Sequence, residues 1–314
     1  MAEYLKHMMK FYIMEEEQLN KETVMKQLNE MTLLDRFLFS EVMEDPEVSQ
    51  IILEVIFGTE IRLLERPQAE KEFHKTPADR SIRIDVYAKD EEGNVYDTEV
   101  QRQGKGNLPK RSRLYQGLID STLLPPGILD FNEMKNCYVI IITPFDILGL
   151  SYYCYTFRMR CDEAPEKSLE DGGIRIFLNT RGTIRNSVSP ELVELLHYIE
   201  NVNGETEVTF ESGRLERLHK RIQVIRNSKE IGVKYMQRWE ERLLDREEGI
   251  AEEKARMLLK GISIIRKMKN KGMDTEAILE LLAEDEAVVL QIYHLICEYP
   301  DSSDETIYQK LNLS

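Results

Sequence analysis

The chain has little of what membrane, disulfide-rich or zinc proteins need. No apolar stretch comes close to the roughly 18 residues that a membrane span requires, and the first 18 residues lack a signal-peptide cleavage pattern. Its four cysteines show no Cys-x-x-Cys spacing, and its five histidines are scattered. We therefore expect reduced cysteines in a cytoplasmic protein without membrane partners. If the protein binds a metal, we expect oxygen ligands.

Basic residues are also in deficit. The 314 residues carry 42 Lys and Arg against 57 Asp and Glu, a net charge of −15. So acidic a total argues against a protein that coats DNA. It leaves room for a local basic groove, because charges more than about 10 Å apart are largely screened at ordinary salt. The length suffices for a sizeable core plus a second unit.

The most informative segment is residues 83–101, RIDVYAKDEEGNVYDTEVQ. Two stretches with alternating side chains flank a loop rich in turn residues, which predicts an antiparallel hairpin. Asp97, Glu99 and Gln101 share one face of the second strand, because side chains i and i+2 point the same way. If Lys89 faces Val95, the same register sets Asp85 opposite Glu99.

Two facing carboxylates repel each other. They are tolerated in bulk water, with a shared proton, or around a cation. Mg²⁺ typically binds one or two protein carboxylates together with waters and phosphate oxygens. The hairpin therefore favours either a metal site for phosphodiester chemistry or a solvated polar face, and its spacing alone does not decide between them.

The rest of the chain adds an ordered set of segments that resembles the recombination-promoting nuclease (Rpn) family of transposase-related proteins, within the PD-(D/E)XK nuclease superfamily. The resemblance covers roughly residues 31 to 250. Besides the hairpin, its segments are LLDRFLFSEVM (33–43), LPKRSRLYQ (108–116) with Asp120, YVIIITPFD (138–146), FLNTRG (177–182) and YM (235–236). A chance motif would not bring so many segments in order.

This resemblance implies an α/β restriction-endonuclease-like core, a mixed sheet flanked by helices, that cuts DNA with Mg²⁺ and possible use of Mn²⁺. Asp85 and Glu99 match the metal-binding carboxylates. Gln101 matches the position where most of the superfamily has a catalytic lysine. An amide has no charge, so water activation should rest more on the metal, and Lys105 or Arg102 is a candidate for the missing charge.

Asp35 is a further candidate metal ligand. Helical spacing aligns it with Phe39 and Val42, toward an apolar face, and the superfamily often completes its metal shell from the first core helix. The alternative is an aspartate that caps this helix after Thr32. Both roles remain open from the sequence.

A basic segment follows the Glu-x-Gln. Residues 101–118 contain five basic residues and no acidic one, and Pro109 suits the first turn of a helix that runs to Ile119. On that helix Arg111 and Tyr115 share a face. We expect a clamp for DNA phosphates here, made by Arg102, Lys105, Lys110, Arg111, Arg113 and Tyr115. The alternative is a set of idle surface charges.

The chain divides into a helical N-terminal extension (1–30), the nuclease core (31–200) and a C-terminal helical region (201–314). In the core we expect helices over 31–57 broken near Pro46, strands at 61–64, 137–142, 152–159 and 174–178, and a polar stretch over 66–79. Between Arg214 and Lys271, 17 basic residues face nine acidic ones. This segment is a coiled-coil arm for homo-oligomers, a basic helix on DNA, or a helix packed on the core. Its apolar repeat is short and interrupted by Gly232 and Gly249, which argues against a long coiled coil.

Two functions remain in competition. The first is a metal-dependent DNA endonuclease that promotes recombination. The second is a catalytically silent nuclease-fold module that binds DNA or a protein partner. A strand-joining transposase normally uses three carboxylates on a different fold, and no such triad is visible in this sequence.

Overall fold

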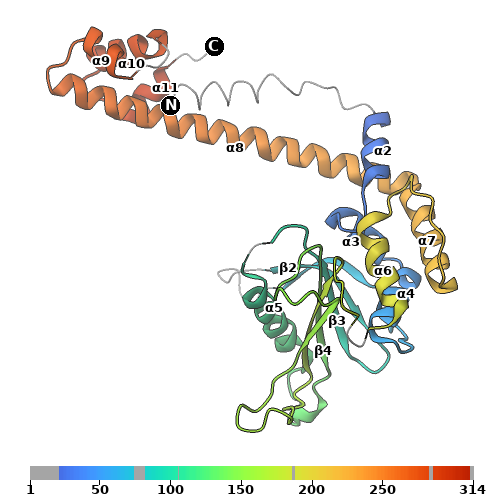
Figure 1. Cartoon of the computed structure of the whole chain (residues 1–314). Helices are drawn as coiled ribbons and strands as arrows, with labels where there is room; N and C mark the ends of the chain where they lie inside the picture. The colour runs from blue at the N-terminus through green and yellow to red at the C-terminus, as the bar shows by residue number, and fades with distance from the viewer. Residues whose placement is uncertain (1–20, 74–81, 105, 186–187, 283–285, 312–314) are drawn as a thin grey trace. The chain divides into compact units, whose positions relative to one another are not determined.

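The computed structural model describes residues 21–73, 82–104, 106–185, 188–282 and 286–311. The strands are β1 (Gln68–Phe73), β2 (Ile82–Lys89), β3 (Val95–Val100), β4 (Cys137–Thr143), β5 (Cys154–Phe157) and β6 (Gly173–Asn179). The helices are α2 (Lys21–Glu30), α3 (Arg36–Met43), α4 (Pro46–Phe57), α5 (Leu108–Leu123), α6 (Pro190–Asn201), α7 (Gly213–Arg226), α8 (Lys229–Asn270), α9 (Thr275–Leu282), α10 (Glu286–Glu298) and α11 (Asp304–Lys310), with a short 3₁₀ turn at Phe131–Glu133 (Figure 1).

The strands form one mixed sheet in the order β1-β2-β3-β4-β6-β5. β3, β4 and β6 are parallel to one another, whereas the other pairs are antiparallel. The predicted hairpin is confirmed, with Lys89 opposite Val95. Its loop closes because Asp90 Oδ1 accepts from the Asn94 amide at 2.8 Å, and Gly93 adopts a positive φ of 88°.

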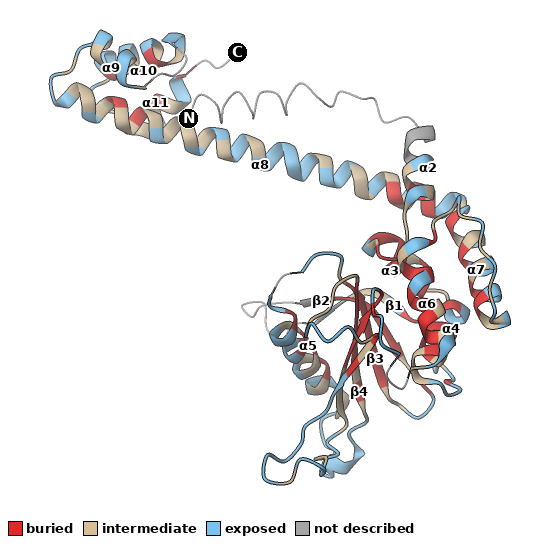
Figure 2. Ribbon diagram, viewed as in Figure 1, coloured by how far each residue is buried: buried red, intermediate tan, exposed pale blue. Residues whose placement is uncertain are grey.

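Helices cover both faces of this sheet, as Figure 1 shows for α5 on one side and α4 on the other. The α5 face has a core in which Tyr115 and Ile119 pack against Val139 and Ile141 of β4. On the opposite face, Phe57 of α4 meets the rings of two tyrosines from β3 and β4. Figure 2 shows the central strands buried between these layers. The predicted fold class, a mixed sheet flanked by helices, is confirmed.

The edge of the sheet differs from the prediction. The strand expected at 61–64 is wrong, since that segment contributes one isolated bridge, Leu63 with Asp90. The edge strand is β1, which lies in the stretch described from the sequence only as polar. Its sequence QAEKEF lacks apolar alternation because an edge strand pairs on one side only and can expose polar side chains. A pattern search for hydrophobic periodicity therefore passes over it.

The break expected near Pro46 is confirmed. Pro46 begins α4, and the Asp45 side chain caps it by accepting from the amides of Glu47 and Val48. At the other end of the core, Asn179 Oδ1 accepts from the Arg181 amide in the turn after β6. Gly182 is required there, since a Cβ would lie 2.6 Å from the Tyr153 ring.

The chain separates into two compact units. The unit with the sheet ends at Tyr235, beyond residue 200 where the sequence analysis ended the core. It includes α7, whose Leu215, Leu218 and Ile222 are fully buried, so α7 is the helix packed on the core that was one of three alternatives. The expected N-terminal extension lies outside the described residues up to residue 20; its end forms α2.

The second unit comprises the described residues from Met236 onward. Its core is formed by the end of α8 and by α9 to α11, with Ile262, Ile265, Ile278 and Ile292 buried. Helix α8 is continuous over 42 residues and includes both Gly232 and Gly249. A single glycine costs a helix only about 1 kcal/mol relative to alanine. Over the residues described here, none of the helices is both long enough and apolar enough for a membrane crossing.

Candidate active site

Three carboxyl groups lie on one face of the β2–β3 hairpin. The observed register pairs Val86 with Thr98, and one further step sets Asp85 opposite Glu99. Asp97 precedes Glu99 by two residues and so projects from the same face of β3. The exposed fraction is 3% for Asp85, 0% for Asp97 and 1% for Glu99. The polar face of the hairpin is therefore buried, and the interpretation as a solvated surface is wrong.

Burial and mutual repulsion shift the protonation of these groups. Burial and the nearby charge of Asp85 raise the pKa of Glu99 to about 7, although Arg111 partly opposes this shift. Burial also raises the pKa of Asp85, although Arg36 counteracts it. The pKa of Asp97 lies well above its usual range because of burial and the charges of Glu99 and Asp85. Neither Asp97 oxygen has a hydrogen-bond partner, so this carboxyl favours its neutral form.

Two arginines from different helices balance the charge. Arg36, the first residue of α3, pairs through Nε with Asp85 Oδ1. Arg111 of α5 donates from Nη2 to Glu99 Oε2 at 2.6 Å and from Nη1 to Gln101 Oε1 at 2.8 Å. The site thus joins the hairpin to α3 and α5. Charge-assisted bonds of this length are among the stronger ones in proteins.

The structure brings together four of the predicted residues, namely Asp85, Glu99, Gln101 and Arg111. Tyr115 lies beside them, with its ring centroid 5.3 Å from Arg111 Cζ, as the shared helix face predicted. Tyr115 is 9% exposed, and burial, with the charge of Glu99, raises its pKa to about 12. The Tyr115 ring packs against the guanidinium of Arg111. Its contact with a DNA phosphate stays a prediction.

Asp35 occupies the N-cap position of α3. Its Oδ1 accepts from the amides of Phe37 at 3.0 Å and Leu38 at 3.4 Å. The capping role, one of two alternatives from the sequence, is confirmed, and it also fixes the start of the helix that carries Arg36. The role of Asp35 as a metal ligand remains a prediction.

The remaining basic candidates are more peripheral. Lys110, Arg113 and Arg102 are exposed, as groups that grip a DNA backbone must be. Lys105 lies outside the described residues. Arg102 also lines a hollow of about 370 Å³ together with Thr32, Phe145 and Arg181. This hollow lies at the carboxyl ends of the parallel strands β3, β4 and β6, next to Gln101.

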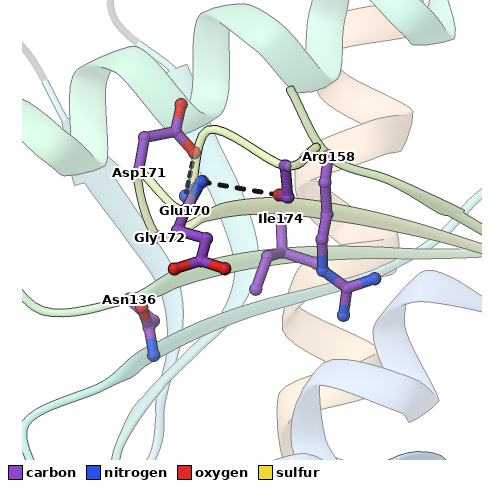
Figure 3. A pocket seen from close by; sticks show the side chains of 8 residues that line it. Asn136, Arg158, Glu170, Asp171, Gly172 and Ile174 are labelled. Atoms are coloured by element: carbon purple, nitrogen blue, oxygen red, sulfur yellow. Dashed lines mark hydrogen bonds between the residues drawn. The ribbon is translucent and has the colours of Figure 1, made fainter. Parts of the chain in front are cut away.

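Another hollow, of about 310 Å³, lies at the opposite end of the parallel strands (Figure 3). Asn136, Arg158 and the segment 170–174 line it, at the amino ends of β4 and β6. Asp171 accepts there from the Gly173 amide at 3.1 Å. Since Glu99 lies toward the carboxyl end of β3, this second hollow is separate from the carboxylates.

Two residues of the site were missed from sequence. Arg36 follows directly on Asp35, in the opening segment that carries the resemblance, and its signal was a lone cation before an apolar run. Asp97 was noted only for sharing a face with Glu99. Asp97 and Glu99 are two residues apart on a strand whose apolar residues Val95, Tyr96 and Val100 indicate burial. This pattern would have predicted a buried acid at position 97.

The donor set is compatible with a hard divalent cation. Asp85 and Glu99 face each other, carry unfavourable buried negative charge, and offer oxygen ligands. Among the described residues there is no group of three or more His, Cys, Asp or Glu side chains that could hold a metal. The residues fit an ion that takes two protein carboxylates and fills its other positions with water and phosphate oxygens.

Comparison with known proteins places this site in a family. The family model described as PD-(D/E)XK nuclease family transposase matches residues 36–253, a range that contains the sheet, both arginines and all three carboxyl groups. No curated protein and no solved structure matches the chain. Because the match covers more than half of the chain, the protein belongs to the PD-(D/E)XK nuclease family transposases and has a nuclease- or transposase-associated function.

Proposed function

We propose that this protein is a metal-dependent DNA endonuclease that hydrolyses phosphodiester bonds and promotes recombination, with Mg²⁺ as its ion and Mn²⁺ as a substitute. The observation that carries the proposal is the facing pair Asp85 and Glu99, buried on adjacent strands with the pKa of Glu99 raised to about 7. Such a perturbed pair, in a family of nucleases, is typical of a functional site.

Asp85 and Glu99 would hold the ion, which when bound polarises the phosphate and lowers the pKa of its water. Arg111 and Arg36 are ion-paired with these carboxylates, and both would contact a DNA phosphate bound there. The exposed Lys110, Arg113 and Arg102 would contact neighbouring phosphates along the strand.

A catalytically silent module that binds DNA or a protein is the second candidate. It is favoured by one observation, that both carboxylates are ion-paired with arginine. We also propose a cytoplasmic location, since the four cysteines are free, and homo-oligomers through the C-terminal helices. Sedimentation of the full chain tests the latter, and a monomer at all concentrations would exclude it.

The decisive experiment incubates supercoiled plasmid with the wild type, Asp85→Ala, Glu99→Ala and Asp171→Ala, in Mg²⁺, Mn²⁺, Ca²⁺ or EDTA. Asp171 is a carboxylate just before β6, at the opposite end of the parallel strands, and serves as the matched control. We expect nicking in Mg²⁺ or Mn²⁺ that falls by about 100-fold or more in the first two variants and is retained in the third.

Equal nicking by all four proteins would refute the site. Absence of nicking in any metal, with DNA binding intact in Ca²⁺, would favour the silent module. Gel analysis of the products also distinguishes nicked, cut and joined strands.

A further inference from the structure

The side chain of Gln101 is fully engaged within the site. Its Oε1 accepts from Arg111 Nη1 at 2.8 Å, and its Nε2 donates to the Gln103 carbonyl at 3.0 Å. The amide is therefore fixed at both ends, with its oxygen turned to the guanidinium. Because an amide carries no charge and no titratable proton, Gln101 cannot itself supply the positive charge that a lysine would bring to this position. It can hold a group that does.

Arg111 is held from three directions. Its two terminal nitrogens bind Glu99 and Gln101, two positions of one strand face, and its guanidinium lies by the Tyr115 ring. The side chain is 26% exposed, so it is anchored but still reaches solvent. α5 brings it there rigidly, because Leu108 and Ile119 of the same helix are buried in the core. A cation fixed this way loses little entropy when it meets a phosphate.

The other candidates for this charge are less well placed. Arg102 is exposed and lines the hollow beside Gln101, whereas Arg36 contacts the opposite carboxylate, Asp85. Among the cations that the structure describes, Arg111 is hydrogen-bonded to both Glu99 and Gln101. The uncharged residue 101 is thus bonded to a cation of α5 that lies ten residues further along the chain.

We propose that Arg111 is a catalytic residue that contacts the oxygens of the phosphate being cut, and that Gln101 is its positioning residue. The two side chains act as one unit: the guanidinium of Arg111 carries the charge, and the amide of Gln101 holds the guanidinium in place. This inference rests on the proposed endonuclease function and assigns the cation within it. It also predicts that a lysine at position 101 can replace the unit, because its ammonium would reach the space that the guanidinium occupies.

The test moves the charge from one residue to the other. We compare the wild type with Arg111→Gln, Gln101→Lys/Arg111→Gln, Arg111→Lys and Arg221→Gln. Arg221 of α7 is the control, since it forms an ion pair outside the site with Asp45, the N-cap residue of α4. We expect plasmid nicking to fall about 100-fold in Arg111→Gln. The double variant and Arg111→Lys should each nick at least about tenfold faster than Arg111→Gln. Nicking by Arg221→Gln should equal that of the wild type.

Calorimetric titration with Ca²⁺ alone gives a second measurement that needs no catalysis. At about pH 8.5, above the pKa of Glu99, removal of a cation 2.6 Å from that carboxylate should tighten Ca²⁺ binding several-fold in Arg111→Gln. The double variant should return toward the wild type. Circular dichroism melting establishes that each variant is folded.

The outcomes separate this inference from the proposed function. If the wild type nicks DNA but Arg111→Gln nicks equally well, or the double variant is no faster than Arg111→Gln, the inference is wrong and the endonuclease stands. If the wild type does not nick in any metal, the proposed function fails. Even if the wild type does not nick, a Ca²⁺ affinity that is the same in the wild type, in Arg111→Gln and in the double variant would refute the shared role of Arg111 and Gln101.

Discussion

Burial of like charges governs the site at the level of single residues. Asp85, Asp97 and Glu99 lie on one buried face, and Arg36 and Arg111 bring two positive charges to them. Carboxylates in such surroundings are costly when ionised. Such a cost is typical of functional sites, in agreement with the cation site proposed above.

A pH dependence of stability follows from Glu99. Its pKa is about 7 in the folded chain against an ordinary value of 4.5, so the folded state holds the proton more tightly. The stability due to this proton is fully present below pH 4.5 and is lost as pH rises to 7. At 1.36 kcal/mol per pKa unit the loss is on the order of 3 kcal/mol.

Urea unfolding of the wild type and Glu99→Gln at several pH values isolates this effect, since glutamine does not titrate. We expect the wild type to lose stability relative to Glu99→Gln between pH 4.5 and 7. A difference that stays constant over this interval would show that Glu99 titrates normally.

At the level of elements, one buried arginine connects segments far apart in the chain. Arg226, the last residue of α7, is 1% exposed. Its Nη1 donates to the carbonyls of Leu28 at 2.9 Å, Asn29 at 3.3 Å and Met31 at 2.7 Å. These carbonyls end α2 and lead to α3, the helix that begins at the Asp35 cap and supplies Arg36. Arg226 therefore fixes the approach of α3 to the sheet.

Arg226→Met should lower the free energy of unfolding by about 3 kcal/mol, because the buried carbonyl of Leu28 and the partly buried carbonyls of Asn29 and Met31 each lose a donor while the apolar volume is largely kept. Arg217→Met is the matched control, on an exposed position of the same helix, and should change stability by less than about 0.5 kcal/mol. Chemical denaturation measures both. Similar losses in the two variants would mean that the carbonyl contacts contribute little.

At the level of the whole molecule, the chain has two separate cores. The sheet unit buries Val139, Ile141 and their neighbours, and the unit from Met236 onward buries its own cluster. Clusters that share no buried residues can open independently. Stability in one unit should therefore be adjustable without a change in the chemistry of the other.

Ile292→Ala tests this independence. Ile292 is 2% exposed in the helical unit, and its truncation should cost about 3 kcal/mol. Hydrogen exchange should accelerate over residues 262–311 and remain unchanged in β2, β3 and β4, with plasmid nicking retained. Leu290→Ala, at a position 40% exposed on the same helix, should alter neither. Faster exchange in the strands would show that the two units unfold together.

The sequence by itself determined the local features of this protein. Alternation of side chains and a turn-rich loop specify the hairpin and its register, and hence the facing pair Asp85 and Glu99, because these depend on residues close together in the chain. Capping at Asp35 and the break at Pro46 are local in the same sense. The family resemblance then added the chemistry that spacing alone left open.

Only the tertiary structure decided which charges meet. Arg36 reaches Asp85 from α3, and Arg111 reaches Gln101 and Glu99 from α5, contacts that depend on how helices pack on both faces of the sheet. The polar edge strand β1 also follows from pairing with β2, and it leaves no hydrophobic period to detect. Long-range packing determines which residues are buried, and burial gives the carboxylates their altered pKa values. Neither the burial nor the pKa shift can therefore be predicted from the spacing of residues along the chain.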